Sequence, residues 1–145
     1  MTKIVFVSDS SILISFDGQP STEISSLVTS LFNKLANLKN LSITNLHPAY
    51  CSLLVDFDLR SCSPSKIFNF LSEQLQSVNL NENSESDTIE IPICYDGEDL
   101  FEVTQITGLT QHEVIQLHSE TEYTVAFLGF APGFPYLLGL PQSLV

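Results

Sequence analysis

The sequence predicts an α+β protein: a first domain with two helices on a mostly antiparallel sheet, followed by the start of a β-rich second domain. Three observations support this prediction. Apolar residues alternate in several short runs, which is typical of strands, and two longer stretches repeat them at helical spacing. A polar, acidic segment then precedes a region rich in glycine, proline and aromatic residues.

Four strands are expected in the first 80 residues. The clearest covers residues 11–17, where Ile12, Ile14 and Phe16 alternate with other residues and point to one face. A run just before it, separated by a short polar turn, is expected to pair with it. The remaining three expected strands lie at about residues 3–7, 41–47 and 51–57.

Two helices are expected between and after these strands. The first begins with Ser21 or Thr22 as its N-cap, and the second begins at Ser63-Pro64, where a capping residue precedes a proline at the first helical position. With residues 88–94 as a closing strand, the elements contain a split βαββαβ arrangement. Both apolar helix stripes would then be buried against one face of the sheet.

Domain organisation follows from the change in composition. We expect an α+β domain over residues 1–80, an acidic linker over 81–87, and part of a second domain over 88–145. In the second part Gly108 is expected to stop a short helix. Thr110 and Glu113 form a capping box that opens the next helix, and a strand is expected over residues 123–128.

The charge distribution argues against two classes of partner. The formal net charge is −12, all five basic residues precede residue 67, and residues 67–145 carry twelve acids without a Lys or Arg. We therefore expect no nucleic-acid partner and no binding to anionic membranes. The sequence has neither a signal-peptide pattern nor an apolar run near the roughly 20 residues that span a bilayer. With three widely spaced cysteines, this favours the cytoplasm.

Common catalytic signatures are absent from the sequence. It contains no phosphate-binding Walker A loop, no nucleophile elbow and no dinucleotide-binding glycine fingerprint. His112-Glu113 begins a pattern close to a zinc-protease motif, but Gln116 stands where the second histidine is needed. We therefore predict no metal site in this chain.

The segment 129–141 is the strongest candidate for a binding surface. It has three glycines and three prolines in thirteen residues, and no ionisable residue except tyrosine follows Glu122. Glycine and proline together impose a particular loop path, which would present aromatic rings to a ligand or a protein. The alternative is a turn-rich segment packed within its own domain. The candidate residues are Gly129, Phe130, Pro132, Gly133, Phe134, Pro135 and Tyr136.

His118 is a second candidate, because it ends the helix that begins at Thr110. A histidine near a helix C-terminus is favoured as imidazolium by the helix dipole. It could act as an acid, a base or a hydrogen-bonding group, or it could be a purely structural histidine.

The motif Leu117-His-Ser-x-x-x-Tyr123, followed by the segment 129–141, resembles the KipI/allophanate hydrolase subunit 1 family. That family includes the small subunit of bacterial ATP-dependent 5-oxoprolinase. Three upstream motifs agree with the resemblance: Ile91-Pro-Ile-Cys-Tyr-Asp-Gly97, Thr107-Gly-Leu-Thr110 and Pro48-Ala-Tyr50-x-Ser-Leu-Leu-Val-x-Phe-Asp58.

The resemblance implies a cytoplasmic protein whose second domain is cyclophilin-like. It implies a subunit of an enzyme that opens 5-oxo-L-proline to L-glutamate, acting with a companion allophanate hydrolase subunit 2-like protein and a further subunit. ATP would be bound through that complex and not by this chain alone. Two other roles are implied: an inhibitor of a histidine kinase, or a carboxyltransferase-type module related to urea carboxylase.

The resemblance also leads us to expect a shortened chain, because family members continue through most of the second domain. His118, Tyr123 and the loop 130–136 would form part of a site shared with the companion subunit.

Overall fold

The structure, a computed structural model, describes residues 2–38, 42–78 and 87–145. It divides into two compact units, which are described separately. The first contains residues 1–83 with 126–136, and the second contains residues 84–125 with 137–145. Residues 81–86 of the expected acidic linker lie outside the described residues, so the linker and the domain limits drawn from it stay predictions.

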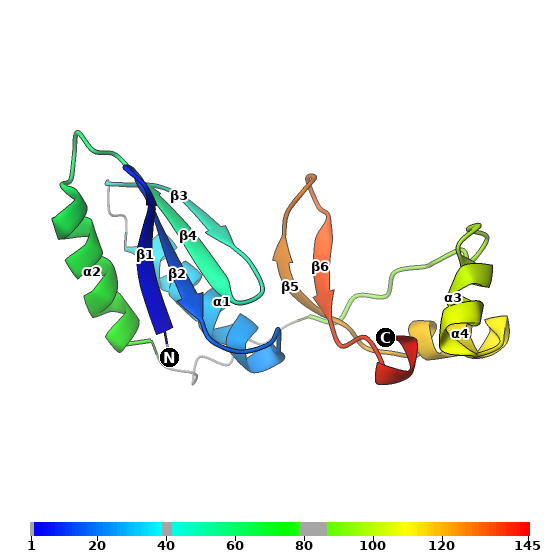
Figure 1. Ribbon diagram of the computed structural model, residues 1–145. Coiled ribbons are helices and arrows are strands. Elements are labelled where there is room, and N and C mark those ends of the chain that lie inside the picture. The colour runs from blue at the N-terminus through cyan, green and yellow to red at the C-terminus, as the bar shows by residue number, and fades with distance from the viewer. Residues whose placement is uncertain (1, 39–41, 79–86) are drawn as a thin grey trace. The chain divides into compact units, whose positions relative to one another are not determined.

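The first unit is built on a four-stranded antiparallel sheet (Figure 1). Its strands stand in the order β1-β2-β4-β3, and Ile12 and Ile14 of β2 face Val55 and Leu53 of β4. All four strands expected in this region are confirmed, although residue 41 lies outside the described part. Their bounds are β1 Thr2–Ser8, β2 Ser11–Phe16, β3 Ile43–Pro48 and β4 Ser52–Phe57.

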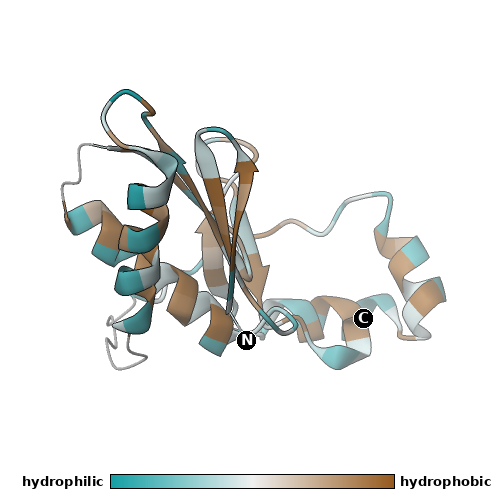
Figure 2. Cartoon of the chain, turned by 60° about the vertical axis from the view of Figure 1, so that its left-hand side comes forward, coloured by the Kyte–Doolittle hydropathy of each residue, from teal (hydrophilic) through white to brown (hydrophobic). Residues whose placement is uncertain are grey.

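Two helices, α1 (Thr22–Asn37) and α2 (Pro64–Gln76), cover one face of this sheet. Both starting points are confirmed: the Ser21 hydroxyl accepts a hydrogen bond from the Ile24 amide at 3.3 Å, and Pro64 follows the N-cap Ser63. Figure 2 shows hydrophobic residues, in brown, recurring along the strands and helices. Alternate residues of β2 and β4 meet the helix stripes in one core: Ile12, Ile14, Phe16, Leu53, Val55, Phe57, Val28, Leu31, Leu35, Ile67 and Leu71.

The closing strand expected over residues 88–94 is wrong, because this segment has no regular secondary structure. In a split βαββαβ sheet that strand would lie beside β2, on the side away from β4. β1 already pairs with β2 along that edge, so no open edge is left for it there. The alternating isoleucines that suggested a strand remain exposed: Ile89, Ile91 and Ile93.

The second unit contains the helices α3 (Leu100–Thr107) and α4 (Gln111–Ser119) and a final 3₁₀ turn, Gln142–Leu144. Gly108 ends α3 in the left-handed conformation with φ +73°, as expected of a glycine cap. The capping box at the start of α4 is also confirmed, since Thr110 and Glu113 exchange side-chain and backbone hydrogen bonds. None of the described helices is long and apolar enough to cross a membrane.

A hairpin of β5 (Thr124–Leu128) and β6 (Pro135–Leu138) completes the described elements. The strand expected over residues 123–128 is confirmed, whereas β6 was not expected within the glycine- and proline-rich segment. The observed architecture is thus mixed α/β with antiparallel sheets. The described residues of the second unit are mostly helix and loop, so its expected cyclophilin-like, β-rich character stays a prediction.

Candidate functional site

The tip of the β5–β6 hairpin is closed by its own backbone. The Gly129 amide donates to the Phe134 carbonyl at 3.1 Å, and the Ala131 amide donates to the Gly129 carbonyl at 2.8 Å. The latter bond makes a γ-turn centred on Phe130, whose φ of +66° selects the rarer and more strained form of this turn. A bulky residue with this φ is an outlier, and such strain is concentrated at functional sites.

A second turn follows directly. The Phe134 amide donates to the Ala131 carbonyl at 3.0 Å, which closes a β-turn with Pro132 and Gly133 at its two central positions. Gly133 has φ +79°, and proline followed by a residue with positive φ is the pattern of a type II turn. Pro135 then begins β6. The glycines and prolines of this segment therefore define the loop path, as their spacing suggested.

The aromatic rings of the hairpin form a continuous series. Phe127 and Tyr136 stack, Phe134 lies edge-on to Tyr136 at 5.4 Å between ring centroids, and Phe130 lies edge-on to Phe134 at 5.6 Å. Phe130 is 91% exposed and Phe134 is 46% exposed, so neither ring is sealed in a core. We call this pair, with Pro132 between them, the hairpin tip.

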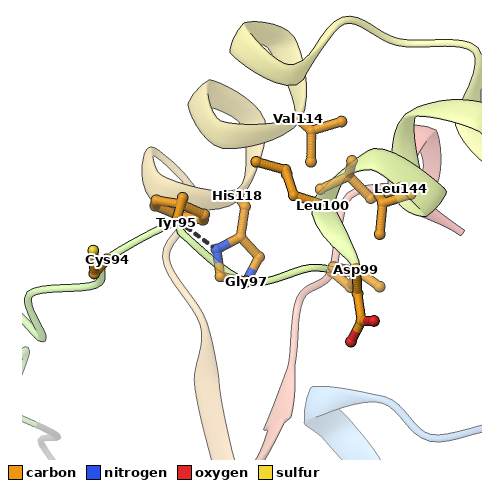
Figure 3. A pocket seen from close by; sticks show the side chains of 10 residues that line it. Cys94, Tyr95, Gly97, Asp99, Leu100, Val114, His118 and Leu144 are labelled. Atoms are coloured by element: carbon orange, nitrogen blue, oxygen red, sulfur yellow. Dashed lines mark hydrogen bonds between the residues drawn. The ribbon is translucent and has the colours of Figure 1, made fainter.

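His118 lies in the last turn of α4, in the second unit. Its Nδ1 is 2.7 Å from the Tyr95 hydroxyl, and the two rings meet edge-on (Figure 3). Both side chains line a cavity of about 370 Å³. Its other walls are mainly aliphatic and come from α3, α4 and the C-terminal segment: Leu100, Val103, Val114, Leu140 and Leu144.

Tyr123 lies beside the same histidine, with ring centroids 5.3 Å apart. Its hydroxyl oxygen is buried and has no hydrogen-bond partner among the described residues. Burial raises the pKa of Tyr123, and the nearby Thr121 hydroxyl offsets this only in part, since its own proton is donated to the Leu117 carbonyl. Tyr123 is therefore an un-ionised phenol at neutral pH, next to His118.

The structure thus groups the candidate residues in two sets. His118 and Tyr123 lie together in the second unit, whereas residues 129–136 belong to the first. The roles assigned to them stay predictions. Sequence reasoning missed Tyr95, although it lies within the 91–97 motif, because its contact with His118 joins positions 23 residues apart.

The cavity beside His118 has a limited set of polar groups. Cys94, Tyr95, Asp99 and His118 supply them, and no Lys or Arg follows residue 66. Among the residues that the structure describes, no group of three His, Cys, Asp or Glu side chains is placed to hold a metal ion. Such a site can fix a small ligand by hydrogen bonds at one end and by apolar contact over the rest.

The chain belongs to the carboxyltransferase domain family, subdomains C and D, whose family model matches residues 2–145. Its relatives include a 5-oxoprolinase subunit of Bacillus subtilis (strain 168), which is 30% identical over 149 residues that cover 94% of this chain and 62% of the relative. The chain therefore spans less than two thirds of the length of that relative.

Solved structures agree with this family. TTHA0988 superposes with a TM-score of 0.76 at 30% identity, over 93% of this chain and 26% of that one. The Kluyveromyces lactis urea carboxylase superposes with a TM-score of 0.71 over 95% of this chain and 14% of its own. Since its identity is 13%, the second likeness concerns the fold alone.

Proposed function

We propose that this chain is part of a 5-oxoprolinase subunit that takes part in the ATP-dependent opening of 5-oxo-L-proline to L-glutamate. The observation that carries the proposal is 30% identity to the 5-oxoprolinase subunit of Bacillus subtilis across 94% of this chain. The cavity beside His118 lies inside the matched family region. We place the protein in the cytoplasm, with a cyclophilin-like second domain.

The proposed reaction needs other subunits. An unstrained lactam is hydrolysed with ATP through an activated intermediate, and the described residues of the second unit do not fit a nucleotide, because they offer no Lys or Arg to phosphates. ATP would be bound with the help of a companion allophanate hydrolase subunit 2-like protein and a further subunit. No step of the reaction is assigned to ATP on this chain.

Within such a complex the cavity beside His118 would take the lactam ring. Its aliphatic walls would exclude water from the bound ring. His118 would donate a hydrogen bond or transfer a proton to the reacting group, and Tyr123 would lie beside it. The hairpin tip would supply an apolar anchor for the companion subunit, since its rings are exposed.

The test is turnover of 5-oxoproline and ATP by the reconstituted complex with His118→Gln. The matched control is His112→Gln, an exposed histidine on the same helix that does not line the cavity. A loss of about 10²-fold or more would point to proton transfer. A loss near tenfold would point to hydrogen bonding. An assembled His118→Gln complex with unchanged turnover would remove His118 from the reaction.

The exposed hairpin tip favours a second candidate, a regulatory binding protein. Phe130 and Phe134 would then insert into an apolar groove on a histidine kinase. Measuring kinase autophosphorylation with the wild-type chain and with Phe130→Ala separates this candidate from the first. Inhibition that disappears in the variant would support it, and no inhibition together with oxoproline turnover would exclude it.

The match to a carboxyltransferase domain favours a third candidate, a carboxyltransferase-type module related to urea carboxylase. It would predict transfer of a carboxyl group from a carboxylated carrier in place of lactam opening. Assaying the reconstituted complex for both reactions distinguishes them.

A further inference from the structure

We infer that Tyr95 is a positioning residue that holds neutral His118 with its proton on Nε2, so that His118 offers a hydrogen-bond donor to an uncharged carbonyl oxygen in the cavity. The inference rests on the proposed function for the identity of the ligand. The part that concerns Tyr95 and His118 stands on their contact alone.

The contact fixes which atom carries the proton. The Tyr95 hydroxyl oxygen is 2.7 Å from His118 Nδ1, a short distance for a hydrogen bond to nitrogen (Figure 3). A neutral imidazole has one acceptor nitrogen and one N–H, whereas an un-ionised phenol is a better donor than acceptor. The Tyr95 proton therefore goes to Nδ1, and the remaining imidazole proton lies on Nε2.

Neighbouring elements hold this arrangement in place. The His118 ring is in edge-on contact with Tyr95, and Tyr123 lies against it on a tilted plane at 5.3 Å. The helix that carries His118 is fixed at its start by the Thr110–Glu113 capping box. A ring packed between two phenols in this way presents one defined nitrogen to a ligand.

The cavity also selects the charge of the ligand. Asp99 is the one carboxyl side chain among its lining residues, and the chain has no Lys or Arg after residue 66. A carboxylate placed in the cavity would meet Asp99 without a compensating cation from this unit. A neutral amide or lactam carbonyl avoids this penalty. For 5-oxoproline, the lactam carbonyl would meet His118 and the carboxylate would point away from these residues.

The tautomer is measured directly by long-range ¹H–¹⁵N NMR of the whole chain labelled at histidine nitrogen, at a pH where His118 is neutral. His118→Gln assigns the signals, and His112→Gln serves as the matched control. We expect the Nε2–H tautomer for His118, with an Nδ1 resonance displaced by hydrogen bonding. Tyr95→Phe should return that resonance to the position of a free acceptor nitrogen. A proton found on Nδ1 in the wild type would overturn the inference, as would an Nδ1 resonance unchanged in Tyr95→Phe.

The ligand class is tested by titration with two small probes. 2-Pyrrolidinone, a neutral lactam, should shift the His118 Nε2–H signal in a saturable way, and acetate should not. Tyr95→Phe should bind 2-pyrrolidinone roughly two- to tenfold more weakly, the effect expected when one hydrogen bond loses its fixed geometry. A shift with acetate but not with 2-pyrrolidinone, or no shift with 2-pyrrolidinone at all, would overturn the assignment of the ligand.

These measurements separate the inference from the proposed function. The expected tautomer and lactam response with no turnover in the complex would leave the inference standing and remove the function. Turnover of 5-oxoproline with His118 protonated on Nδ1 would do the reverse.

Discussion

Phe127 and Tyr136 stack face to face across the β5–β6 hairpin, with ring centroids 4.4 Å apart and planes within 8° of parallel. Tyr50, from the β3–β4 connection of the same unit, meets Phe127 edge-on at 5.1 Å. Cross-strand aromatic pairs are each worth about 0.5–1.5 kcal/mol beyond their buried area. The stack therefore supports the two turns that follow it and helps to hold the strained Phe130 in place.

The φ of +66° at Phe130 predicts an unusual order of stability among variants. A residue with a Cβ pays about 1–2 kcal/mol in the left-handed region, whereas glycine does not. Phe130→Gly should therefore stabilise the tip by about 1 kcal/mol relative to Phe130→Ala, since both remove the ring. Exchange of the Gly129 and Phe134 amides, which are bonded within the tip, reports its opening free energy. Greater protection in Phe130→Ala than in Phe130→Gly would contradict this account.

Gly108 provides a similar test in the second unit. It caps α3 with φ +73°, and a Cβ added to it would touch nothing within 4 Å. Gly108→Ala should therefore cost about 1 kcal/mol through backbone strain alone. Gly97→Ala is the matched control, since a Cβ there also meets no atom within 4 Å and its φ is not positive. Thermal unfolding should show a lower Tm for the first variant only; equal Tm values would refute the argument.

The capping box of α4 predicts a dependence on pH. The hydrogen bonds from the Thr110 side chain and backbone hold the pKa of Glu113 below its ordinary value of 4.5. A carboxyl group whose pKa is lower in the folded state stabilises the fold above its unfolded pKa, and this contribution disappears as the pH falls through the folded pKa. Amide protection of α4 should therefore decline below about pH 4.5.

Glu113→Gln separates this effect from the titration of other acids, because glutamine keeps an acceptor for the capping box but does not ionise. The acid-induced loss of protection in α4 should be smaller in Glu113→Gln than in the wild type. Identical pH profiles would show that Glu113 does not contribute.

Leu31 and Leu38 test the core of the first unit. Leu31 of α1 is fully buried among residues of both central strands and the second helix, whereas Leu38 at the end of α1 is 46% exposed. Leu31→Ala should lower the free energy of unfolding by about 3 kcal/mol, and Leu38→Ala by less than about 1 kcal/mol. Urea unfolding followed by circular dichroism gives both values. Similar losses for the two variants would show that the burial described here does not decide stability.

Local sequence signals predicted much of the first unit. Ser21 and Ser63 mark helix starts because a cap and the apolar stripe behind it are both contained in a few residues. The closing strand failed because alternating isoleucines indicate a tendency to pair and not the presence of a partner. β1, which lies far away in the sequence, had already taken the edge beside β2.

The candidate site was less predictable. The loop path could be anticipated from Pro132 and Gly133, but the left-handed φ lies at Phe130 as well, although a glycine precedes it. Nothing local selects a phenylalanine for this conformation. The contact of Tyr95 with His118 depends on how an irregular segment runs past the end of α4, which spacing alone does not encode.

The irregular segment around Ile89, Ile91 and Ile93 has a consequence for handling the protein. These side chains are 78%, 70% and 53% exposed, and an alternating β-branched run without a strand partner among the described residues is a template for cross-chain association. Glu90 within the run and the acids around it act as gatekeepers through like-charge repulsion. Colloidal stability should therefore be greatest in low-salt buffers near neutrality, and turbidity should appear as the solution approaches the isoelectric point near pH 4.2.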